Sequence, residues 1–355
     1  MDTALSFDSQ IQKLEEKIKA SNFPPDLLEK VNGMLSLLKA TMTNQAGSFI
    51  NYESISRYID WVASLPFNKE TTDFLDLNKA KQTLDKNHHG LDSVKNRILE
   101  YLAGIILSME NGSNDKVIRA PILCLIGLVG TGKTTLAYSI AEALGRKFER
   151  IPFGGMGDAR ALRGQSRAFA DAEPGFIIKK LVHSQSKNSV ILLDELDRVT
   201  ESARSDIMGV LVELLDPEQN KAFTDHYIDY PFDLSHTLFI ATANNTTNIS
   251  TAVLDRLEIV QMPSYTDDEK IVIAKSYLFP KIRTNTGLLE NQLLIDDSLW
   301  LNIIRPLGFD SGIRSLERTI EGVCRKVARL IVEGKISKEN SFKITPENIK
   351  QFLPT

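Results

Sequence analysis

Gly127, Gly132, Lys133 and Thr134 follow the pattern Gly, four residues, Gly-Lys-Thr, within the stretch LIGLVGTGKTTLA. Glycines let backbone N–H groups converge on phosphate oxygens, and a helix that begins directly after them adds positive potential. In this pattern the lysine neutralises the β- and γ-phosphates and the threonine reaches Mg²⁺. The alternative is a glycine-rich turn in an unrelated fold. The residues expected to contact a nucleotide are Gly127, Leu128, Val129, Gly130, Thr131, Gly132, Lys133, Thr134 and Thr135.

Two acidic residues end the apolar run VILLDEL, about sixty residues after the glycine-rich stretch. Successive strand residues point to opposite sides, so Asp194 and Glu195 can do different work. We expect Asp194 to hold Mg²⁺ together with Thr134, and Glu195 to polarise the water that attacks the γ-phosphorus of ATP. An acidic strand end exposed to solvent is the alternative.

Three further polar residues follow apolar or helical patterns. Asn244, at the end of FIATANN, is placed to orient the attacking water, although it also suits a turn. Arg256, in VLDRLEIV, is either a surface ion-pair partner or a cation that a neighbouring subunit places on the γ-phosphate. Arg314, at the start of a long helical pattern, is expected to reach the phosphates from a second domain.

The elements that must position these residues are strands that alternate with helices. Between residues 121 and 262 the apolar runs are ILCLIG, KFERIPF, VILLD, TLFIATAN and LEIVQM. Such alternation is typical of an α/β protein with a parallel sheet and helices on both faces. Helical patterns precede and follow it, with Ile55, Tyr58, Ile59 and Val62 as one example of helical spacing. We therefore expect a helical segment (1–66), a large nucleotide-binding α/β domain (67–264) and a small helical lid (265–355).

Composition excludes several classes of protein. The 355 residues are 42% hydrophobic with a net charge of −4, and no run of five or six like charges favours nucleic acid. The apolar stretch Tyr101–Met109 is much shorter than the roughly 18 residues of a membrane span. The first residues lack the pattern of a signal peptide, so we expect a cytoplasmic protein with no membrane partner. Cys124 and Cys324 show no metal-ligand spacing and are expected to be reduced core thiols.

Several longer stretches resemble the ATPase module of the Lon protease family, which belongs to the AAA+ superfamily. They cover nearly the whole chain, from about Gln10 to Leu353. The stretch DPEQN…DHY is specific to that family among AAA+ branches. The matching stretches are YIDWVASLPF, GLDSVKNRILEYLA, PILCLIG, LLDPEQNKAFTDHY, DYPFDLS, FIATANN and SGIRSLER.

The resemblance implies an α/β P-loop NTPase domain of AAA+ type and a lid, assembled into a homo-oligomer, a hexameric ring that threads unfolded or damaged protein through its pore. It implies that Asn244 senses the γ-phosphate, that Arg256 acts on a neighbouring subunit and that Arg314 acts from the lid. His89 and Leu91, in the stretch HHGL, match the adenine side, with histidine where tyrosine is usual. Phe169 and Ala170 match the pore loop that grips substrate.

Two departures from the family bear on function. The pore loop reads Phe169, Ala170, Asp171 where the family has an aromatic residue, an aliphatic residue and glycine, so whether this loop still grips substrate stays open. A Ser-Lys peptidase domain is not found after the lid, so these residues alone are expected to show no peptidase activity. Two other functions stay open: a nucleotide-dependent scaffold, and a nucleic-acid motor, which the mixed charges of the long helix after Arg314 disfavour.

Overall fold

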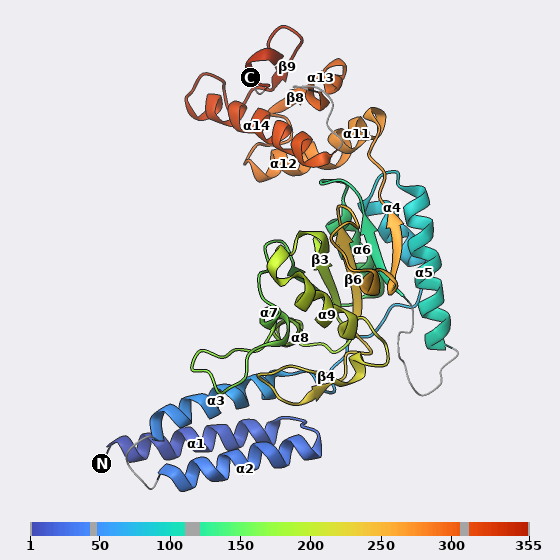
Figure 1. Ribbon diagram of the computed structural model, residues 1–355. Helices are drawn as coiled ribbons and strands as arrows, with labels where there is room; N and C mark the ends of the chain where they lie inside the picture. Colours follow the sequence, from blue (N-terminus) through green and yellow to red (C-terminus); the bar gives the residue numbers. More distant parts are fainter. Residues whose placement is uncertain (1, 43–47, 111–120, 306–311, 354–355) are drawn as a thin grey trace.

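The computed structural model describes residues 2–42, 48–110, 121–305 and 312–353. Three regions follow one another in Figure 1: three N-terminal helices, a central sheet covered by helices, and a smaller, mainly helical region that holds the C-terminus. Among the described helices, none combines the length and the apolar character that a membrane crossing requires.

The N-terminal region consists of α1 (Asp2–Ala20), α2 (Pro25–Met42) and α3 (Ser48–Ser64). Apolar residues at intervals of three and four give each helix one apolar stripe. Tyr58, Ile59 and Val62, which the spacing places on such a stripe, are fully buried. The other buried members of the three stripes are Ile11, Leu14, Ile18, Leu27, Val31, Leu35 and Leu38.

The central sheet is parallel and contains all five apolar runs that the sequence analysis identifies. Its strands in spatial order are β2 (Phe148–Pro152), β3 (Val190–Asp194), β6 (Leu238–Ala243), β1 (Ile122–Ile126) and β7 (Leu257–Gln261). Since every strand runs in the same direction, the residues that follow β1, β3 and β6 meet at one edge of the sheet. The phosphate-loop glycines follow β1, the acidic pair spans the end of β3, and Asn244 follows β6.

The two faces of the sheet bury alternate residues of each strand against different helices. One face packs Leu123, Leu125 and Ile240 against α4 (Leu77–Asn87), α5 (Asp92–Glu110) and α6 (Lys133–Leu144). The other face packs Cys124, Ile191 and Leu193 against α8 (Phe176–Ser184) and α9 (Arg204–Leu214). The shorter elements of this region are α7 (Arg160–Arg163), the antiparallel pair β4 (Phe223–Thr224) and β5 (Pro231–Phe232), and α10 (Thr251–Leu254).

The C-terminal region has its own core. Its long helix α14 (Ile313–Val332) buries Leu316, Ile320, Val323 and Val327 along one stripe. Helix α11 (Asp267–Ile273) begins with a capping box between Thr266 and Glu269. The remaining elements are a π-helical turn (Ala274–Leu278), α12 (Phe279–Asn285), α13 (Trp300–Ile304) and the parallel pair β8 (Leu293–Ile295) and β9 (Phe342–Ile344).

Helix α4 is joined to α6 by a buried polar contact. His88, which caps the C-terminus of α4, has its Nε2 2.9 Å from Ser139 Oγ on α6. Asn87 Nδ2 donates to the same hydroxyl at 3.0 Å and to Glu142 Oε2 at 2.7 Å. Burial, and then the nearby charge of Lys95, lower the pKa of His88 from 6.5 to about 4. The imidazole is therefore neutral at physiological pH.

This lowered pKa predicts an acid-sensitive contact. Because the unfolded chain takes up a proton near pH 6.5 and the folded chain does so only near pH 4, the contribution of His88 to stability is present above pH 6.5 and lost as the pH falls toward 4. Between pH 7 and pH 5 that loss is about 2 kcal/mol. Urea unfolding of the wild type and of His88→Gln at both pH values measures it. Equal losses in the two proteins would contradict the assignment.

Candidate nucleotide site

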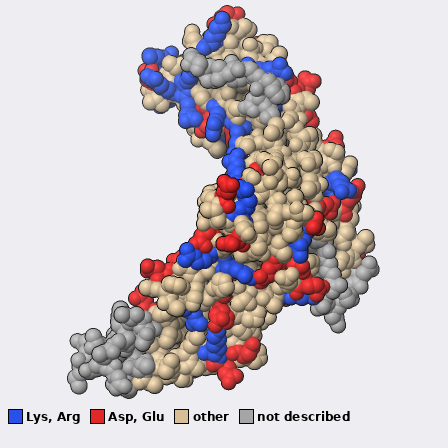
Figure 2. Space-filling view, viewed as in Figure 1, with Lys and Arg blue, Asp and Glu red and all other residues tan. Residues whose placement is uncertain are grey.

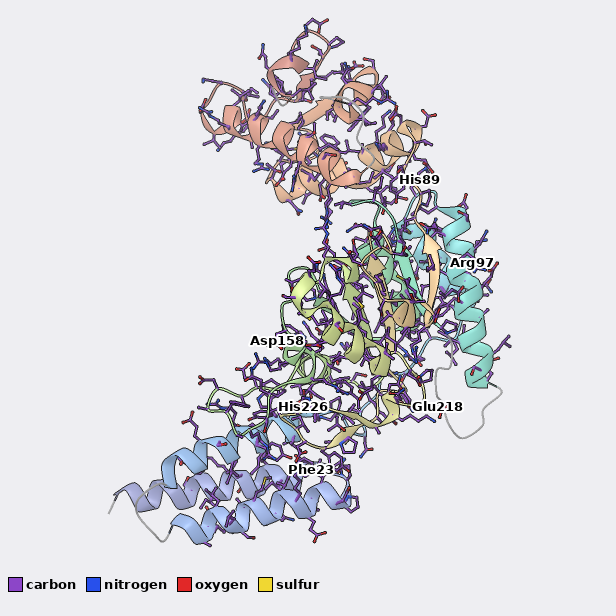
Figure 3. The ribbon with its side chains drawn as sticks, viewed as in Figure 1. Phe23, His89, Arg97, Asp158, Glu218 and His226 are labelled. Atoms are coloured by element: carbon purple, nitrogen blue, oxygen red, sulfur yellow. The ribbon has the colours of Figure 1, made fainter. Side chains whose placement is uncertain are left out.

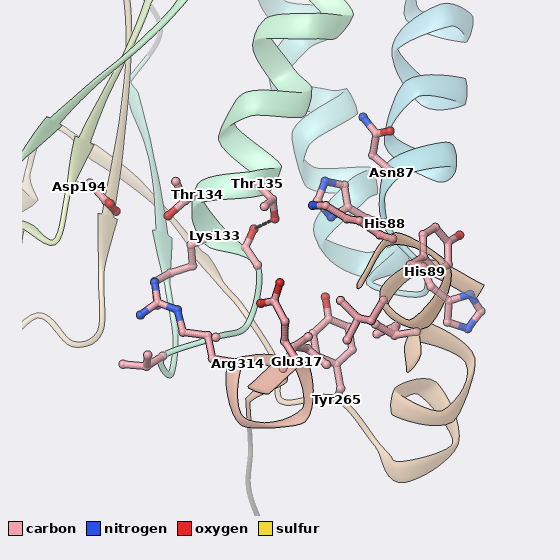
Figure 4. Close-up of a pocket in the computed structure, with 18 of the residues that line it drawn as sticks. Asn87, His88, His89, Lys133, Thr134, Thr135, Asp194, Tyr265, Arg314 and Glu317 are labelled. Carbon is pink, nitrogen blue, oxygen red and sulfur yellow. Dashed lines mark hydrogen bonds between the residues drawn. The ribbon is translucent and has the colours of Figure 1, made fainter. Parts of the chain in front are cut away.

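A cavity of about 430 Å³ lies at the edge of the sheet where β1, β3 and β6 end. The large region contributes Lys133, Thr134, Asp194, Glu195 and Asn244 to its walls, and the C-terminal region contributes Arg314 and Glu317 from the first turns of α14. Figure 4 shows Lys133, Thr134, Asp194 and Arg314 around one space, with the histidines farther along the same pocket. Residues far apart in the sequence are thus brought together between two regions of the chain.

The loop before α6 requires glycine at three positions. Gly130 and Gly132 have φ values of +82° and +92°, in the left-handed region that other residues rarely adopt. A Cβ atom on Gly127 would lie 2.6 Å from the carbonyl oxygen of Met262. This backbone directs the loop around the N-terminus of α6, where unpaired N–H groups favour an anion.

The structure divides the predicted loop residues into two groups. Six of them line the cavity, and these are Val129, Gly130, Gly132, Lys133, Thr134 and Thr135. Gly127, Leu128 and Thr131 belong to the same loop but do not line the cavity, and the hydroxyl of Thr131 donates to the carbonyl of Leu128 at 2.9 Å.

Lys133 is held inside the loop by its own backbone. Its Nζ donates to the carbonyls of Gly127 and Leu128 at 2.6 and 2.9 Å and to Asn244 Oδ1 at 3.2 Å. Burial lowers the pKa of Lys133, and the carboxylates of Asp197, Asp194 and Glu195 oppose that shift. A partly desolvated ammonium group that already donates to oxygen atoms is suited to donate to phosphate oxygens in their place.

Asp194 and Glu195 are both fixed by Thr242, a residue that the sequence analysis missed. The hydroxyl of Thr242 donates to Asp194 Oδ1, and the same hydroxyl accepts the backbone N–H of Glu195 at 3.0 Å. Glu195 has a φ of +62°, so the chain turns sharply after β3. The other oxygen of Asp194 accepts from Arg150 Nε at 2.6 Å. Thr242 lies on β6, the strand that pairs with β3, two positions before Asn244. That position near the end of a strand next to β3 is the feature that could have identified Thr242 from the sequence.

Asn244 is oriented by Asp197, the second residue that was missed. Its backbone N–H donates to Asp197 Oδ1 at 3.0 Å and its Nδ2 donates to Oδ2 at 3.3 Å. With both of these bonds formed, the side-chain carbonyl of Asn244 faces Lys133. Asp197 is 6% exposed, and its position three residues after Asp194 in DELD was the signal in the sequence.

Thr134 and Asp194 line the same cavity as oxygen donors. This donor set fits magnesium, which prefers oxygen ligands. At the opposite end of the cavity His89 forms part of the wall, next to His88 and Tyr265, and Tyr277 lines the same cavity. Leu91 is buried in the core of that face with Val94 and Ile98 and is not a wall residue.

The C-terminal region touches the phosphate loop directly. The N–H of Ile313, the first residue of α14, donates to the carbonyl of Gly130 at 3.1 Å. A Cβ on Gly312 would lie 2.6 Å from the carbonyl oxygen of Val129. Arg314 follows immediately and points into the cavity in Figure 4.

Arg256 and the predicted pore loop lie outside the cavity. Arg256 precedes β7, and its carbonyl accepts the N–H of Ile122 at the beginning of β1, so it sits at the opposite edge of the sheet. Its guanidinium binds Asp216 at 3.0 Å and the carbonyl of Ala252 at 2.8 Å. Phe169 is 64% exposed in the loop between α7 and α8, and Ala170 next to it is exposed.

Comparison with known proteins agrees with this arrangement. Residues 123–265 match the ATPase family associated with various cellular activities (AAA), and residues 284–342 match the Lon protease AAA+ ATPase lid domain. Lon protease of Lawsonia intracellularis is 41% identical over 99% of this chain and 40% of its own length. Lon protease 1 of Bacillus subtilis is 42% identical over 97% of this chain and 43% of its own length. The chain thus spans about two fifths of the length of these relatives, and it belongs to the Lon family, of which it contains the AAA+ ATPase domain and the lid.

Proposed function

We propose that this chain is an ATP-hydrolysing module that uses hydrolysis to unfold protein substrates and move them toward a Ser-Lys peptidase domain outside these residues. The observation that carries the proposal is the convergence of Lys133, Thr134, Asp194, Glu195 and Asn244 on one cavity that Arg314 closes from the lid. Family membership supports ATPase activity in general.

Each residue has a role that follows from its contacts. Lys133 exchanges backbone carbonyls for the β- and γ-phosphates of ATP. Glu195, held by Thr242 at a sharp turn, accepts a proton from the attacking water, and Asn244 orients that water. Magnesium, when bound, supplies positive charge beside the phosphates, and Thr134 and Asp194 are the residues that would hold it.

The lid couples the phosphates to motion. Because the N-terminus of α14 contacts Gly130, a change in the phosphate loop acts on the lid without an intervening side chain. Arg314 adds a charge that binds the γ-phosphate and is released when that phosphate leaves. The resulting lid movement is what we propose to drive Phe169 along a polypeptide.

Arg256 is assigned to the site of a neighbouring subunit. It lies at the edge of the sheet opposite its own cavity, so within one chain it has no route to the γ-phosphate. A ring in which this edge faces the cavity of the next copy brings the two together, and we propose a hexamer. Asp216 holds the guanidinium until that contact forms.

The domain bounds, the cellular location and the class of substrate are part of the same proposal. We propose that 1–66, 67–264 and 265–355 are the helical segment, the large domain and the lid of a cytoplasmic protein that acts on unfolded or damaged proteins. Nucleic acid is disfavoured, because Arg325 and Arg329 of α14 pair with Glu321 and Glu333. Figure 2 shows basic and acidic side chains interspersed over the visible face.

Glu195→Gln tests the hydrolysis step. The amide keeps the shape of the side chain but accepts no proton, so we expect ATP turnover to fall about 10²- to 10⁴-fold. Binding of ATP is retained, and the nucleotide recovered from the protein after gel filtration remains ATP. Lys133→Ala is the matched comparison and is expected to lose nucleotide binding by calorimetry. Turnover by Glu195→Gln at the wild-type rate would remove Glu195 from the mechanism.

Mixing two inactive variants tests the role of Arg256. Arg256→Ala keeps an intact phosphate loop, whereas Lys133→Ala keeps an intact arginine. In a ring assembled from equal amounts of both, about a quarter of the interfaces combine the two intact parts, and ATPase activity returns to roughly that fraction. A mixture that stays as inactive as its components indicates that Arg256 acts within its own subunit.

A nucleotide-dependent scaffold is the second candidate, and the pore loop favours it. Ala170 offers less contact area than the family's aliphatic residue, and Asp171 adds a charge. A scaffold would hydrolyse ATP at a rate that unfolded protein does not change, whereas a translocating module would be stimulated. Titration of the ATPase with denatured casein distinguishes the two.

A further inference from the structure

The connection between β4 and β5, residues 225–230, has no part in the nucleotide site. It contains the DHY of the stretch that distinguishes this family. Three of its six residues are nonetheless buried, with Asp225, Tyr227 and Ile228 at 0%, 3% and 1% exposure, whereas His226 and Asp229 are exposed. In Figure 3, His226 of this connection and Phe23 of the N-terminal segment mark the two sides of the junction between the large region and the N-terminal helices.

One side of the connection closes the base of the loop that carries Phe169, here called the Phe169 loop (residues 164–175). Asp225 Oδ2 accepts the N–H of Gly175 at 2.7 Å, and the N–H of His226 donates to the carbonyl of Arg163 at 2.7 Å. The two ends of the loop are in contact, because a Cβ on Gly175 would lie 2.6 Å from the nitrogen of Gly164. The base of the loop is therefore pinned by main-chain contacts.

The middle of the Phe169 loop is held by the N-terminal helices. Arg167, two residues before Phe169, has its guanidinium carbon 4.1 Å from the ring centroid of Tyr58 on α3. Its Nη1 lies 3.7 Å from Met34 Sδ on α2, and its Nη2 lies 3.9 Å from Asp229. A cation over an aromatic face is attracted to the ring, so Arg167 ties the loop to both helices. Figure 1 shows the loop between α7 and α8 passing along α3.

The N-terminal helices also hold the connection itself. Lys30 of α2 donates to the carbonyl and to the carboxylate of Asp229 at 2.7 and 2.8 Å. The hydroxyl of Tyr58 donates to the carbonyl of Ile228 at 3.1 Å. Asp229 has a φ of +49°, a conformation that the surrounding contacts have to maintain. Helices α2 and α3, the connection and the Phe169 loop thus form one continuous set of contacts.

We propose that helices α2 and α3 and residues 225–230 position the Phe169 loop for protein substrate, with Arg167 as the positioning residue that joins them. The inference rests on the proposed function, since it assigns substrate contact to Phe169. The side chain of Arg167 is partly buried, with 26% of it exposed, and each of its contacts is individually weak, so its loss is expected to loosen the loop without unfolding the protein.

The test compares Arg167→Ala with Arg160→Ala in the full chain. Arg160 is a nearby arginine that pairs only locally, with Asp158, and serves as the control. Hydrogen exchange of the peptide that spans 165–174 is expected to accelerate about tenfold in Arg167→Ala and to stay unchanged in Arg160→Ala. The concentration of denatured casein that half-stimulates ATP hydrolysis is expected to rise about tenfold, while basal hydrolysis is unchanged. Arg167→Lys, which keeps a cation beside Tyr58, restores part of both effects.

Lys30→Ala is a second variant that removes a contact from the helices and not from the loop. It is expected to accelerate hydrogen exchange of the same peptide to a smaller extent than Arg167→Ala does. If Arg167→Ala does not fold, the exchange rate in Lys30→Ala tests the proposal. Exchange of the loop in Arg167→Ala or Lys30→Ala at the rate of the wild type overturns the inference. Failure of the wild type to hydrolyse ATP overturns the proposed function instead, because the exchange measurement requires no hydrolysis.

Discussion

The contact between the tip of the phosphate loop and the first residue of α14 is the constraint on which the active-site geometry depends. The two main chains approach so closely that a Cβ on Gly312 would lie 2.6 Å from the carbonyl oxygen of Val129, and a Cβ on Gly130 would lie 3.1 Å from the nitrogen of Ile313. The hydrogen bond between Ile313 and Gly130 then sets the distance between the large domain and the lid. Arg314 enters the cavity because the helix begins there. Any tilt of α14 moves that guanidinium relative to Asp194 and Thr134.

The parallel sheet places the residues around the cavity at one edge and Arg256 at the other. Residues that follow β1, β3 and β6 gather at one edge and surround the cavity, whereas Arg256, which precedes β7, lies at the other edge. The same chain thus presents the cavity on one side and Arg256 on the other. The proposed action of Arg256 on a neighbouring subunit requires a closed ring, in which both sides of every copy are used.

Much of this architecture could be predicted from local patterns. The five strands, the phosphate loop and the acidic pair all depend on residues close together in the sequence, such as the glycine spacing before Lys133. Thr242, Asp197 and Arg150 were not identified, because their roles arise from the pairing of neighbouring strands and from turns after them. His88 was given no role in the sequence analysis, although packing of α4 on α6 buries it. The contacts of these residues exist only in the folded chain, so the periodicity of the sequence could not reveal them.

The pinned base of the Phe169 loop has a consequence for how this protein tolerates mutation. Gly164, Gly175 and Asp225 leave no space at the neck of the loop, since a Cβ on Gly175 would lie 2.0 Å from the carbonyl oxygen of Leu162. Changes at the neck therefore disturb the core, whereas Ala168, Ala170 and Asp171 project from it into solvent. Above this fixed neck, substitutions among the exposed residues around Phe169, the proposed substrate contact, disturb few packed atoms. Ala170 and Asp171, which differ from the family pattern, lie in this exposed part of the loop.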